Sequence, residues 1–437
     1  MADTDTIFAL ATPPGRSALA VFRISGRRAG DVLDAFTRCV RPPPRLASVR
    51  PIFHPRTGEK IDQVVASYFR APASFTGEEL VELSVHGSRG VIAAVSAALL
   101  EMDEVRIAEP GEFTRRAYLA GKFDLAQAEA IADLIDSDTE FQRRQAVRLL
   151  DGELGRKVED WRNRLLAIAC ELESSLDFSD EGDVREANDE GLARAAENLS
   201  QEIQRAIDAS GRSLALREGF TVVIAGPPNV GKSTLFNSLA GSDLAIVTEI
   251  AGTTRDLLRA ELDLDGVPVT IVDSAGIRES SDPIERIGIE RARTAMASAD
   301  LVLKLQTGAA EGDLNGPFQS SIIVWSKADL CPAPEGLLAI SANDSDSISR
   351  LLSVIRERAL SVVGDGSEGL LARSRHREAL QGAVSGLQRV QTLCRAERLE
   401  LAAEECRFVN SCLGRLSGSY ETEDVLGAIF ARFCIGK

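Results

Sequence analysis

The first part of the chain alternates short apolar runs with turn signals. Ala18–Ile24 and Val64–Phe69 are apolar runs of strand length, and proline and glycine residues punctuate the segments beside them. Three consecutive prolines at 42–44 exclude a helix there. Residues 1 to about 120 therefore predict an α+β region with short strands.

Helical periodicity dominates from about residue 121 to residue 215. Apolar residues recur there about three positions apart, which marks one face of an amphipathic helix. The clearest example is the set Leu125, Ala128, Ile131 and Leu134. The segment Asp177–Glu190 is rich in acidic residues, and we expect it to be a solvated loop between helices.

From about residue 217 to residue 365 the pattern changes to short β-rich runs separated by helical stretches. This alternation is typical of a doubly wound α/β sheet. The predicted strands are Thr221–Ala225, Val267–Val272, Leu301–Leu303, Ile322–Trp325 and Leu338–Ile340.

Helical periodicity returns after the turn signal at 364–366. We infer that this last segment packs on residues 121–215, so that the α/β domain is inserted into a helical one. The residues that share its apolar face are Leu380, Val384, Leu387 and Cys394. The predicted fold is thus multidomain, α+β and α/β, with domains at 1–120, 121–216, 217–366 and 367–437, of which the second and fourth form one discontinuous helical domain.

Composition narrows the classes of protein that fit this pattern. With 437 residues, 44% of them apolar, the chain is long enough for about three domains with buried cores. No stretch without a charged residue is longer than the 13 residues of Leu314–Ser326, whereas a membrane-spanning helix needs about 20. The first residues show no secretory or organelle leader pattern. We therefore expect no membrane segment.

Charge and cysteine usage point to the cytoplasm. The net charge of −16 opposes loose binding to nucleic acid or anionic lipid, so a nucleic-acid partner requires a local basic surface or a second protein. The 7 cysteines and 3 histidines are scattered, without a CxxC pair. This argues against a disulfide framework or a zinc cluster and for a reduced, cytoplasmic compartment.

The strongest chemical signal is the segment GPPNVGKST at 226–234. It follows the strand-like run TVVIA and opens a helical stretch, which is the context that a phosphate-binding P-loop requires. Its glycine backbone N–H groups can converge on phosphate oxygens. Lys232 can reach the β- and γ-phosphates, and the Ser233 hydroxyl can ligate Mg²⁺.

Two further motifs predict a nucleotide-dependent switch. The segment DSAG at 273–276 ends a predicted strand, where Asp273 can hold Mg²⁺ through water and the Gly276 amide can sense the γ-phosphate. The segment GTTRD at 252–256 lies between the P-loop and this motif, where a loop can supply a second Mg²⁺ hydroxyl. Such loops are ordered by the γ-phosphate and released on hydrolysis.

The segment SKAD at 326–329 predicts recognition of guanine. Asp329 can accept hydrogen bonds from the guanine N1–H and N2–H₂ groups, a donor pattern that adenine lacks. Ser341-Ala342 resembles the loop that closes over guanine in GTPases. The predicted ligand is therefore GTP rather than ATP.

Ser326 departs from the usual Asn-Lys-x-Asp pattern of GTPases. A serine lacks the carboxamide that braces the loop and touches the base. We expect Asp329 to preserve the choice of guanine while affinity drops, and Ser326→Asn to tighten GDP binding.

The residues that position the attacking water are less evident. Ile277 stands where Ras-like enzymes carry a glutamine, so hydrolysis requires another group, for which Glu285 is the candidate. The alternative for Glu285 is an ordinary solvated glutamate at a helix start. Asn229, inside the P-loop, can coordinate a monovalent cation beside the phosphates or make a simple loop-stabilising hydrogen bond.

With these residues in place, the chain resembles the MnmE/TrmE family of tRNA-modification GTPases over essentially its whole length. The resemblance rests on the GTPase motifs together with DTIFALATPPGRSALAVFRISG (5–26), SFTGEELVEL (74–83), GEFTRRAYLAGKFDLAQAEAIADLI (111–135) and FCIGK (433–437).

The resemblance implies a folate-binding α+β domain at the N-terminus, a discontinuous helical domain and an inserted Ras-like P-loop GTPase domain. It implies a homodimer formed through the N-terminal domains, which binds 5-formyl- or 5,10-methylene-tetrahydrofolate near that interface. It also implies a K⁺-stimulated GTPase that forms a heterotetramer with an FAD-dependent partner of the MnmG/GidA family. Such complexes add carboxymethylaminomethyl or aminomethyl groups to C5 of the wobble uridine in tRNA.

Matching the family's motifs assigns roles to individual residues. The folate-contacting positions fall on Arg23, Glu82, Lys122 and Lys437, with Glu78 and Glu79 as near alternatives to Glu82. Each, taken alone, is also consistent with a surface charge or a local ion pair. Cys434 matches the family's C-terminal cysteine, for which a free buried thiol is the alternative.

The same matching completes the nucleotide and metal sites and favours Glu285 as the catalytic residue. The K⁺ ligands are Asn229, Thr248, Ile250 and Thr253, and the Mg²⁺ ligands are Ser233 and Thr254. The GTP-binding set is Asn229, Val230, Gly231, Lys232, Ser233, Thr234, Thr248, Glu249, Ile250, Ala251, Gly252, Thr253, Thr254, Asp273, Ser274, Ala275, Gly276, Ser326, Lys327, Ala328, Asp329, Ser341, Ala342 and Asn343.

Two other functions compete with this hypothesis. One is a regulatory GTPase switch in ribosome assembly or stress response, which would have no reason to bind a one-carbon folate. The other is a scaffold whose GTPase is vestigial, which the serine at 326 suggests.

Overall fold

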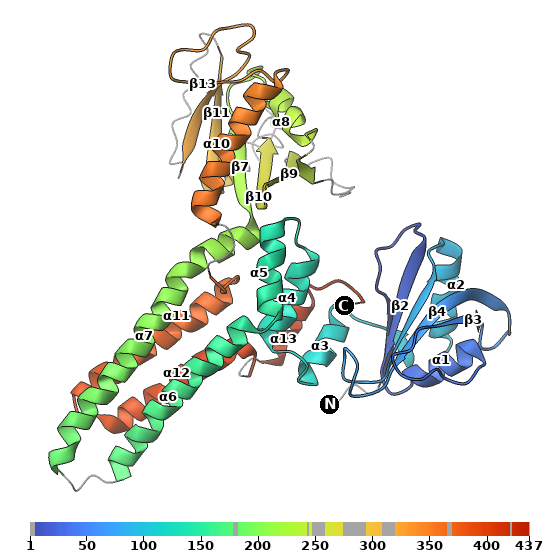
Figure 1. Ribbon diagram of the computed structural model, residues 1–437, viewed down its shortest axis with the longest axis horizontal. Helices are drawn as coiled ribbons and strands as arrows, with labels where there is room; N and C mark the ends of the chain where they lie inside the picture. The colour runs from blue at the N-terminus through green and yellow to red at the C-terminus, as the bar shows by residue number, and fades with distance from the viewer. Residues whose placement is uncertain are drawn as a thin grey trace, which may run out of the picture. The chain divides into compact units, whose positions relative to one another are not determined.

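The computed structural model describes residues 5–177, 182–242, 244–246, 258–273, 294–307, 320–364, 369–419 and 422–436 (Figure 1). The chain divides into two compact units. Unit 1 comprises Met1–Ala132 and Gly414–Lys437, and unit 2 comprises Asp133–Leu413. Over the described ranges, no helix is both long and apolar enough to cross a bilayer.

Unit 1 is built on a six-stranded sheet in the order β3-β4-β5-β2-β1-β6. All its pairs are antiparallel except β1 with β6. The strands are β1 (Thr6–Leu10), β2 (Leu19–Ser25), β3 (Ser48–Phe53), β4 (Lys60–Phe69), β5 (Leu80–His86) and β6 (Val105–Ile107). Strands β2 and β4 confirm the two that the apolar runs predict.

Side-chain alternation gives this sheet two different faces. Phe8, Phe22 and Ile24 pack against α1 (Ala29–Thr37) and α2 (Arg89–Leu100). The neighbouring β1 residues Ile7 and Ala9 point to the opposite face, where they meet Phe113 of α3 (Glu112–Leu119). The predicted α+β region therefore has helices on both faces of its sheet.

The end of the chain packs within unit 1. Leu426 and Phe430 of α13 (Glu423–Phe430) pack with Leu125 and Ala128 of α4 (Leu125–Ile135). Gly111 lies so close that a Cβ atom would stand 2.5 Å from the carbonyl oxygen of Phe430, and its φ is +67°. Only glycine fits this approach without backbone strain.

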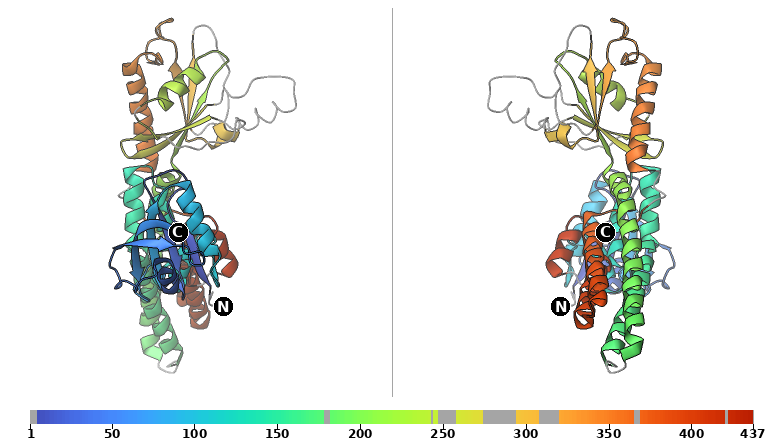
Figure 2. Two further views of the ribbon diagram at one scale, coloured as in Figure 1. Left: turned by 90° about the vertical axis from the view of Figure 1, so that its right-hand side faces the viewer. Right: turned by 90° about the vertical axis from the view of Figure 1, so that its left-hand side faces the viewer.

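Unit 2 contains long helices into which a sheet is inserted. The helices are α5 (Glu140–Leu150), α6 (Glu153–Asp177), α7 (Gly182–Glu218), α11 (Ser374–Arg395) and α12 (Leu399–Ser417), whose last residues belong to unit 1. Helices α7 and α11 run side by side (Figures 1 and 2). This confirms that the segment after the α/β insertion packs on the one before it, and the predicted apolar face of α11 is buried.

One prediction about this region is wrong. Most of the acidic segment 177–190, expected to be a loop, is helical because α7 begins at Gly182. A run of charge signals solvation rather than loss of helix, since glutamate, arginine and alanine all favour helices. Residues 178–181 lie outside the described part of the chain.

The sheet of unit 2 has seven strands in the order β13-β12-β11-β7-β10-β9-β8. Strands β7, β10, β11, β12 and β13 are mutually parallel, and β9 and β8 extend the edge in antiparallel pairs. Helices α8 (Lys232–Ala240) and α10 (Ser345–Val363) contribute to its core. The strands are β7 (Phe220–Ala225), β8 (Ala245–Ile246), β9 (Leu258–Leu264), β10 (Val267–Asp273), β11 (Leu301–Gln306), β12 (Ser321–Trp325) and β13 (Leu338–Ala339).

A buried carboxylate anchors α3 in unit 1. Glu112 is 4% exposed and accepts hydrogen bonds from Arg106 at 2.7 Å, from Arg116 at 2.8 Å and from the backbone N–H of Glu109 at 2.9 Å. Burial opposes its charge, but these hydrogen bonds outweigh burial and lower the pKa of Glu112 below its ordinary value of 4.5.

We predict that Glu112→Gln destabilises unit 1 by about 2 kcal/mol at pH 7, because charge-assisted hydrogen bonds from the half-buried Arg106 and the buried Arg116 to a buried carboxylate are lost. A depressed carboxyl pKa gives stability that is present above the unfolded-state pKa and lost as the pH falls through the folded-state pKa. The difference between wild type and variant should therefore shrink only in the acid range below 4.5. Hydrogen exchange of α3 peptides in denaturant measures it, with Glu109→Gln as the control. An equal loss in both variants contradicts the prediction.

Candidate functional site

The P-loop connects the end of β7 to the start of α8. Gly226 has a φ of +157°, and a Cβ there would stand 2.8 Å from the carbonyl oxygen of Leu305 in the neighbouring strand. Gly231 caps α8 with a φ of +103°. Both glycines therefore hold conformations that side chains disfavour, and the loop turns tightly with its N–H groups at a helix start.

Lys232 lies folded over this loop. Its Nζ donates to the carbonyl oxygens of Gly226 at 2.8 Å and Pro227 at 2.9 Å. Burial lowers its pKa, and the charge of Asp273 opposes that shift. The ammonium is thus held where the loop's own carbonyl groups converge.

Ser233 and Asp273 meet although they are far apart in the sequence. Parallel pairing of β10 with β7 places Asp273 opposite Ile224, close to the P-loop. Ser233 Oγ donates to Asp273 Oδ2 at 3.0 Å, and Asp273 is 1% exposed. A hydroxyl and a carboxylate that adjoin in this way form a donor set of hard oxygens, which suits Mg²⁺.

Ser326, after β12, ties the predicted base-binding loop to the P-loop. It is 4% exposed, and its Oγ lies 2.6 Å from the carbonyl oxygen of Val230 and 3.2 Å from that of Gln306. The expectation that serine leaves this loop without a brace is therefore wrong. The hydroxyl keeps the connection, and what it lacks is a second polar atom for the base.

Lys327 makes a second connection between the same two loops. Its Nζ donates to the carbonyl oxygen of Asn229 at 2.7 Å, and its side chain lies 3.8 Å from where a Cβ of Gly231 would be. Both Lys327 and Asn229 have positive φ, of 55° and 63°. Asp329 lies in the exposed turn that follows, so its carboxylate is accessible to a ligand.

The segment 341–343 is held from two sides. Ser341 exchanges hydrogen bonds with Ser347 at the start of α10, at 3.0 and 3.1 Å. Ser238 of α8 donates to the carbonyl oxygen of Ala342 at 3.3 Å. The helix that starts at the P-loop therefore also positions the loop predicted to cover the base.

Several predicted residues lie outside the described part of the chain, so their roles stay predictions. They are Thr248, Glu249, Ile250, Ala251, Gly252, Thr253, Thr254, Ser274, Ala275, Gly276, Glu285 and Lys437.

A second cluster in unit 1 contains three of the residues predicted to bind folate. Arg23 and Glu82 are paired across β2 and β5, and their side chains form an ion pair of 2.8 Å. The Arg23 guanidinium lies 5.5 Å from the centre of the Phe75 ring, which is 5.4 Å from the ring of Phe123. Lys122, next to Phe123, donates to the carbonyl oxygen of Pro72.

This cluster separates Glu82 from its sequence neighbours. Glu78 accepts a hydrogen bond from Ser25 and pairs with Arg116, and Glu79 accepts a hydrogen bond from Tyr68. Glu82 is the one of the three that pairs with Arg23. Phe75 and Phe123 were missed by reasoning on charge, although each lies inside a motif segment.

Two family models match the chain. Residues 6–122 match the family described as GTP-binding protein TrmE N-terminus, and residues 125–434 match the MnmE helical domain. The chain is 47% identical to the tRNA modification GTPase MnmE of Rhodopseudomonas palustris, over 99% of each chain. It is 44% identical to that of Beijerinckia indica subsp. indica, covering 100% of this chain and 97% of the relative.

A further relative and one solved structure complete the comparison. The tRNA modification GTPase MnmE of Methylobacterium radiotolerans is 44% identical over 100% of both chains. A crystal structure of Era in complex with MgGDPNP and nucleotides 1506–1542 of 16S ribosomal RNA is 25% identical, with a TM-score of 0.26, and covers 32% of this chain and 56% of that chain.

We predict that GDP affinity follows the order Asn, Ser, Ala at position 326. Ser326→Ala should weaken binding about tenfold, because the buried Val230 carbonyl loses its side-chain donor. Ser326→Asn should tighten binding, since a carboxamide can brace the loop and also reach the base. Calorimetric titration of the full chain measures both, with the exposed Ser353→Ala as control. An unchanged affinity in Ser326→Asn refutes the second half.

Proposed function

Because this chain belongs to the MnmE family of tRNA modification GTPases, it is a GTP hydrolase, and we propose how its two sites divide the work. GTP binds in unit 2, and a tetrahydrofolate one-carbon donor binds in unit 1. With an FAD-dependent partner of the MnmG/GidA family, the protein adds carboxymethylaminomethyl or aminomethyl groups to C5 of the wobble uridine in tRNA. The observation that carries this proposal is that one chain holds both the P-loop cluster and the Arg23–Glu82 cluster.

The nucleotide site is argued from its donors. Lys232 donates to the β- and γ-phosphate oxygens, and Ser233 with Asp273 holds Mg²⁺, which neutralises phosphate charge. Asp329 selects guanine through its carboxylate. The short hydrogen bond from Ser326 to Val230 keeps the phosphate and base loops in register.

We propose K⁺ as the second cation. Asn229 is exposed at the turn of the P-loop, so its carboxamide oxygen is free of the core. Thr248, Ile250 and Thr253 complete the proposed ligand set, and Thr254 adds the second Mg²⁺ hydroxyl. A monovalent cation supplies positive charge beside the phosphates, and Glu285 positions the attacking water.

The chemistry of the unit 1 cluster suits a folate. Arg23 and Glu82 are each 29% exposed, so both charges reach solvent beside the Phe75 ring. An arginine suits the anionic glutamate tail, a carboxylate suits the N–H edge of the pterin, and an aromatic ring suits its flat face. Lys122 and Lys437 supply further positive charge.

An exposed apolar patch supports a homodimer formed through unit 1. Val49 on the edge strand β3 pairs across the sheet with Val65 on β4, and they are 65% and 41% exposed. Val40 and Leu46, on the segment leading into β3, are 88% and 52% exposed. Clusters of exposed apolar side chains commonly mark protein interfaces, and we propose a second copy of this chain as the partner.

The negative net charge of the chain affects how the protein can bind tRNA. A net charge of −16 disfavours phosphate contacts over most of the surface. We therefore propose that tRNA is held mainly through the complex with the FAD protein, in the cytoplasm.

We expect that tRNA from cells lacking this gene has lost these wobble-uridine groups, as measured by nucleoside mass spectrometry. The wild-type gene should restore them. A Lys232→Ala variant should not, because the phosphate oxygens lose their charged donor. Intact modification in the deletion strain defeats the proposal and favours a regulatory switch.

We predict that Arg23→Ala weakens binding of 5-formyl-tetrahydrofolate to the full chain about tenfold, the effect of losing one charge-assisted hydrogen bond. Equilibrium dialysis measures it. Arg28→Ala is the matched control, since Arg28 is another partly exposed arginine of unit 1 that pairs with Glu104. Equal affinity in both variants removes Arg23 from the site, and no binding by wild type removes the folate.

A further inference from the structure

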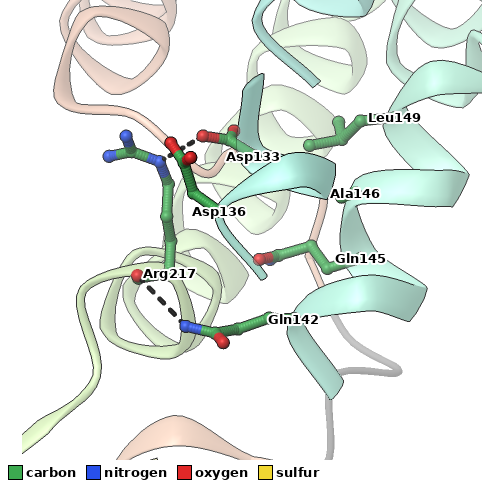
Figure 3. A pocket seen from close by; sticks show the side chains of 7 residues that line it. All are labelled: Asp133, Asp136, Gln142, Gln145, Ala146, Leu149 and Arg217. Atoms are coloured by element: carbon green, nitrogen blue, oxygen red, sulfur yellow. Dashed lines mark hydrogen bonds and ion pairs between the residues drawn. The ribbon is translucent and has the colours of Figure 1, made fainter. Parts of the chain in front are cut away.

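Asp133 bonds to both chain segments that connect the inserted α/β part to the long helices. Its Oδ1 accepts from Arg217 Nε at 2.9 Å and from Arg373 Nη2 at 2.7 Å. Asp133 is 13% exposed, and the side chains of Arg217 and Arg373 are 34% and 16% exposed. Figure 3 shows Asp133 and Arg217 in the wall of a cavity of about 70 Å³.

The two arginines lie on the two chain connections between the sheet and the long helices. Arg217 lies in the last turn of α7, and β7 begins three residues later and leads straight to the P-loop. Arg373 caps α11, the first helix after the chain returns from the sheet. One carboxylate oxygen therefore joins the outgoing and the returning connection.

The described residues of the return connection, 369–373, also lie close against α7. Gly369 has a φ of +78°, and a Cβ there would stand 2.1 Å from Ser213 Oγ and 2.8 Å from the carbonyl oxygen of Ala209. Leu371 and Ala372, which follow, are buried. The described parts of the two connections are thus packed together, and Asp133 bonds to both.

Side chains at the start of α5 bond to the end of α7, close to Arg217. Gln142 Nε2 donates to the carbonyl oxygen of Leu216 at 3.3 Å and, as Figure 3 shows, to that of Arg217 at 3.5 Å. Gln145, 4% exposed, donates to the carbonyl oxygen of Ser213 at 3.3 Å. Polar side chains of α5 thereby bond to carbonyl groups in the last turns of α7, among them those of Leu216 and Arg217 at its end.

Phe141, beside Gln142, reaches into the α/β part. Its ring packs against the core of the seven-stranded sheet, and a Cβ on Gly266 would stand 2.8 Å from it. Gly266, with a φ of +93°, forms with Asp265 the turn between β9 and β10. The other end of β10 is Asp273, the carboxylate that contacts Ser233.

We propose that the corner made by Asp133, Phe141 and Gln142 couples the GTPase part to the helical part, with Asp133 as its positioning residue. Phe141 follows displacements of the β9–β10 hairpin, which carries Asp273. Because Arg217 and Arg373 share one oxygen, movement of either connection strains the bond to the other, so the two connections move together. Coupling of this kind travels through packed elements that change arrangement as a unit.

Hydrogen exchange of the full chain tests this directly. In the wild type, exchange in peptides covering 133–150 should differ between the GDP-bound and the GTP-analogue-bound states. In Asp133→Ala that difference should fall about fivefold or more, while GTP turnover stays within about twofold, since the bonds of Asp133 go to Arg217 and Arg373 and to none of the described nucleotide-binding residues. Wobble-uridine modification in complemented cells should fall about tenfold.

The control variants distinguish a coupling role of Asp133 from a purely structural one. Asp136→Ala changes the same residue type in the wall of the same cavity, where Asp136 makes no ion pair with any described residue, and it should behave like wild type. Asp133→Asn keeps an acceptor for the arginines and should fall between, which keeps the test usable if Asp133→Ala does not fold. The proposal is overturned if hydrogen exchange in wild-type peptides covering 133–150 is the same in both nucleotide states. It is also overturned if Asp133→Ala retains the wild-type difference between those states. Hydrogen exchange and GTP turnover are independent of folate and of the FAD protein, whereas the modification readout rests on the proposed function.

Discussion

Parallel strand pairing is the constraint on which the nucleotide site depends. Strand β7 lies between β10 and β11, with β12 beyond, and all four run the same way. The loops that follow them must therefore leave from one edge of the sheet. This brings together the P-loop, Asp273 and Ser326 from positions up to about a hundred residues apart. The hydrogen bonds from Ser233 to Asp273 and from Ser326 to Val230 follow from that edge.

The same strand also joins the site to the long helices. Gly219 is the single residue between α7 and β7, and its φ of +81° turns the chain directly from helix to strand. A sheet inserted in this way has only two covalent connections to its host, and here both meet at Asp133. The hairpin contact at Phe141 adds a third, non-covalent link. Such a junction limits the directions in which the sheet can move relative to the long helices.

Sequence patterns predicted the elements whose structure depends mainly on neighbouring residues. The buried strands of the seven-stranded sheet are apolar runs, so the sequence pattern predicted them. Strand β9 was missed because its sequence, LRAELDL, alternates charged with apolar residues and lacks a continuous apolar run. The acidic start of α7 was assigned to a loop because a run of charged residues indicates exposure to solvent but does not determine the backbone conformation. Arg23, Glu82 and Lys122 followed from family resemblance rather than from any pattern. The Asp133 bonds were out of reach, since their partners lie 84 and 240 residues away.

The departure at position 326 separates two tasks that one asparagine performs in other GTPases. Bracing the P-loop needs only a donor near Val230, and a hydroxyl at 2.6 Å supplies it from a buried position. Contact with the base needs a longer side chain, which serine lacks. We propose that the choice of guanine rests on the carboxylate of Asp329, which lies three residues on and is exposed, so that this choice does not depend on the brace. We therefore expect the loss of the carboxamide to lower affinity for the base while the hydroxyl still holds the phosphate loop, which suits an enzyme that must release GDP between cycles.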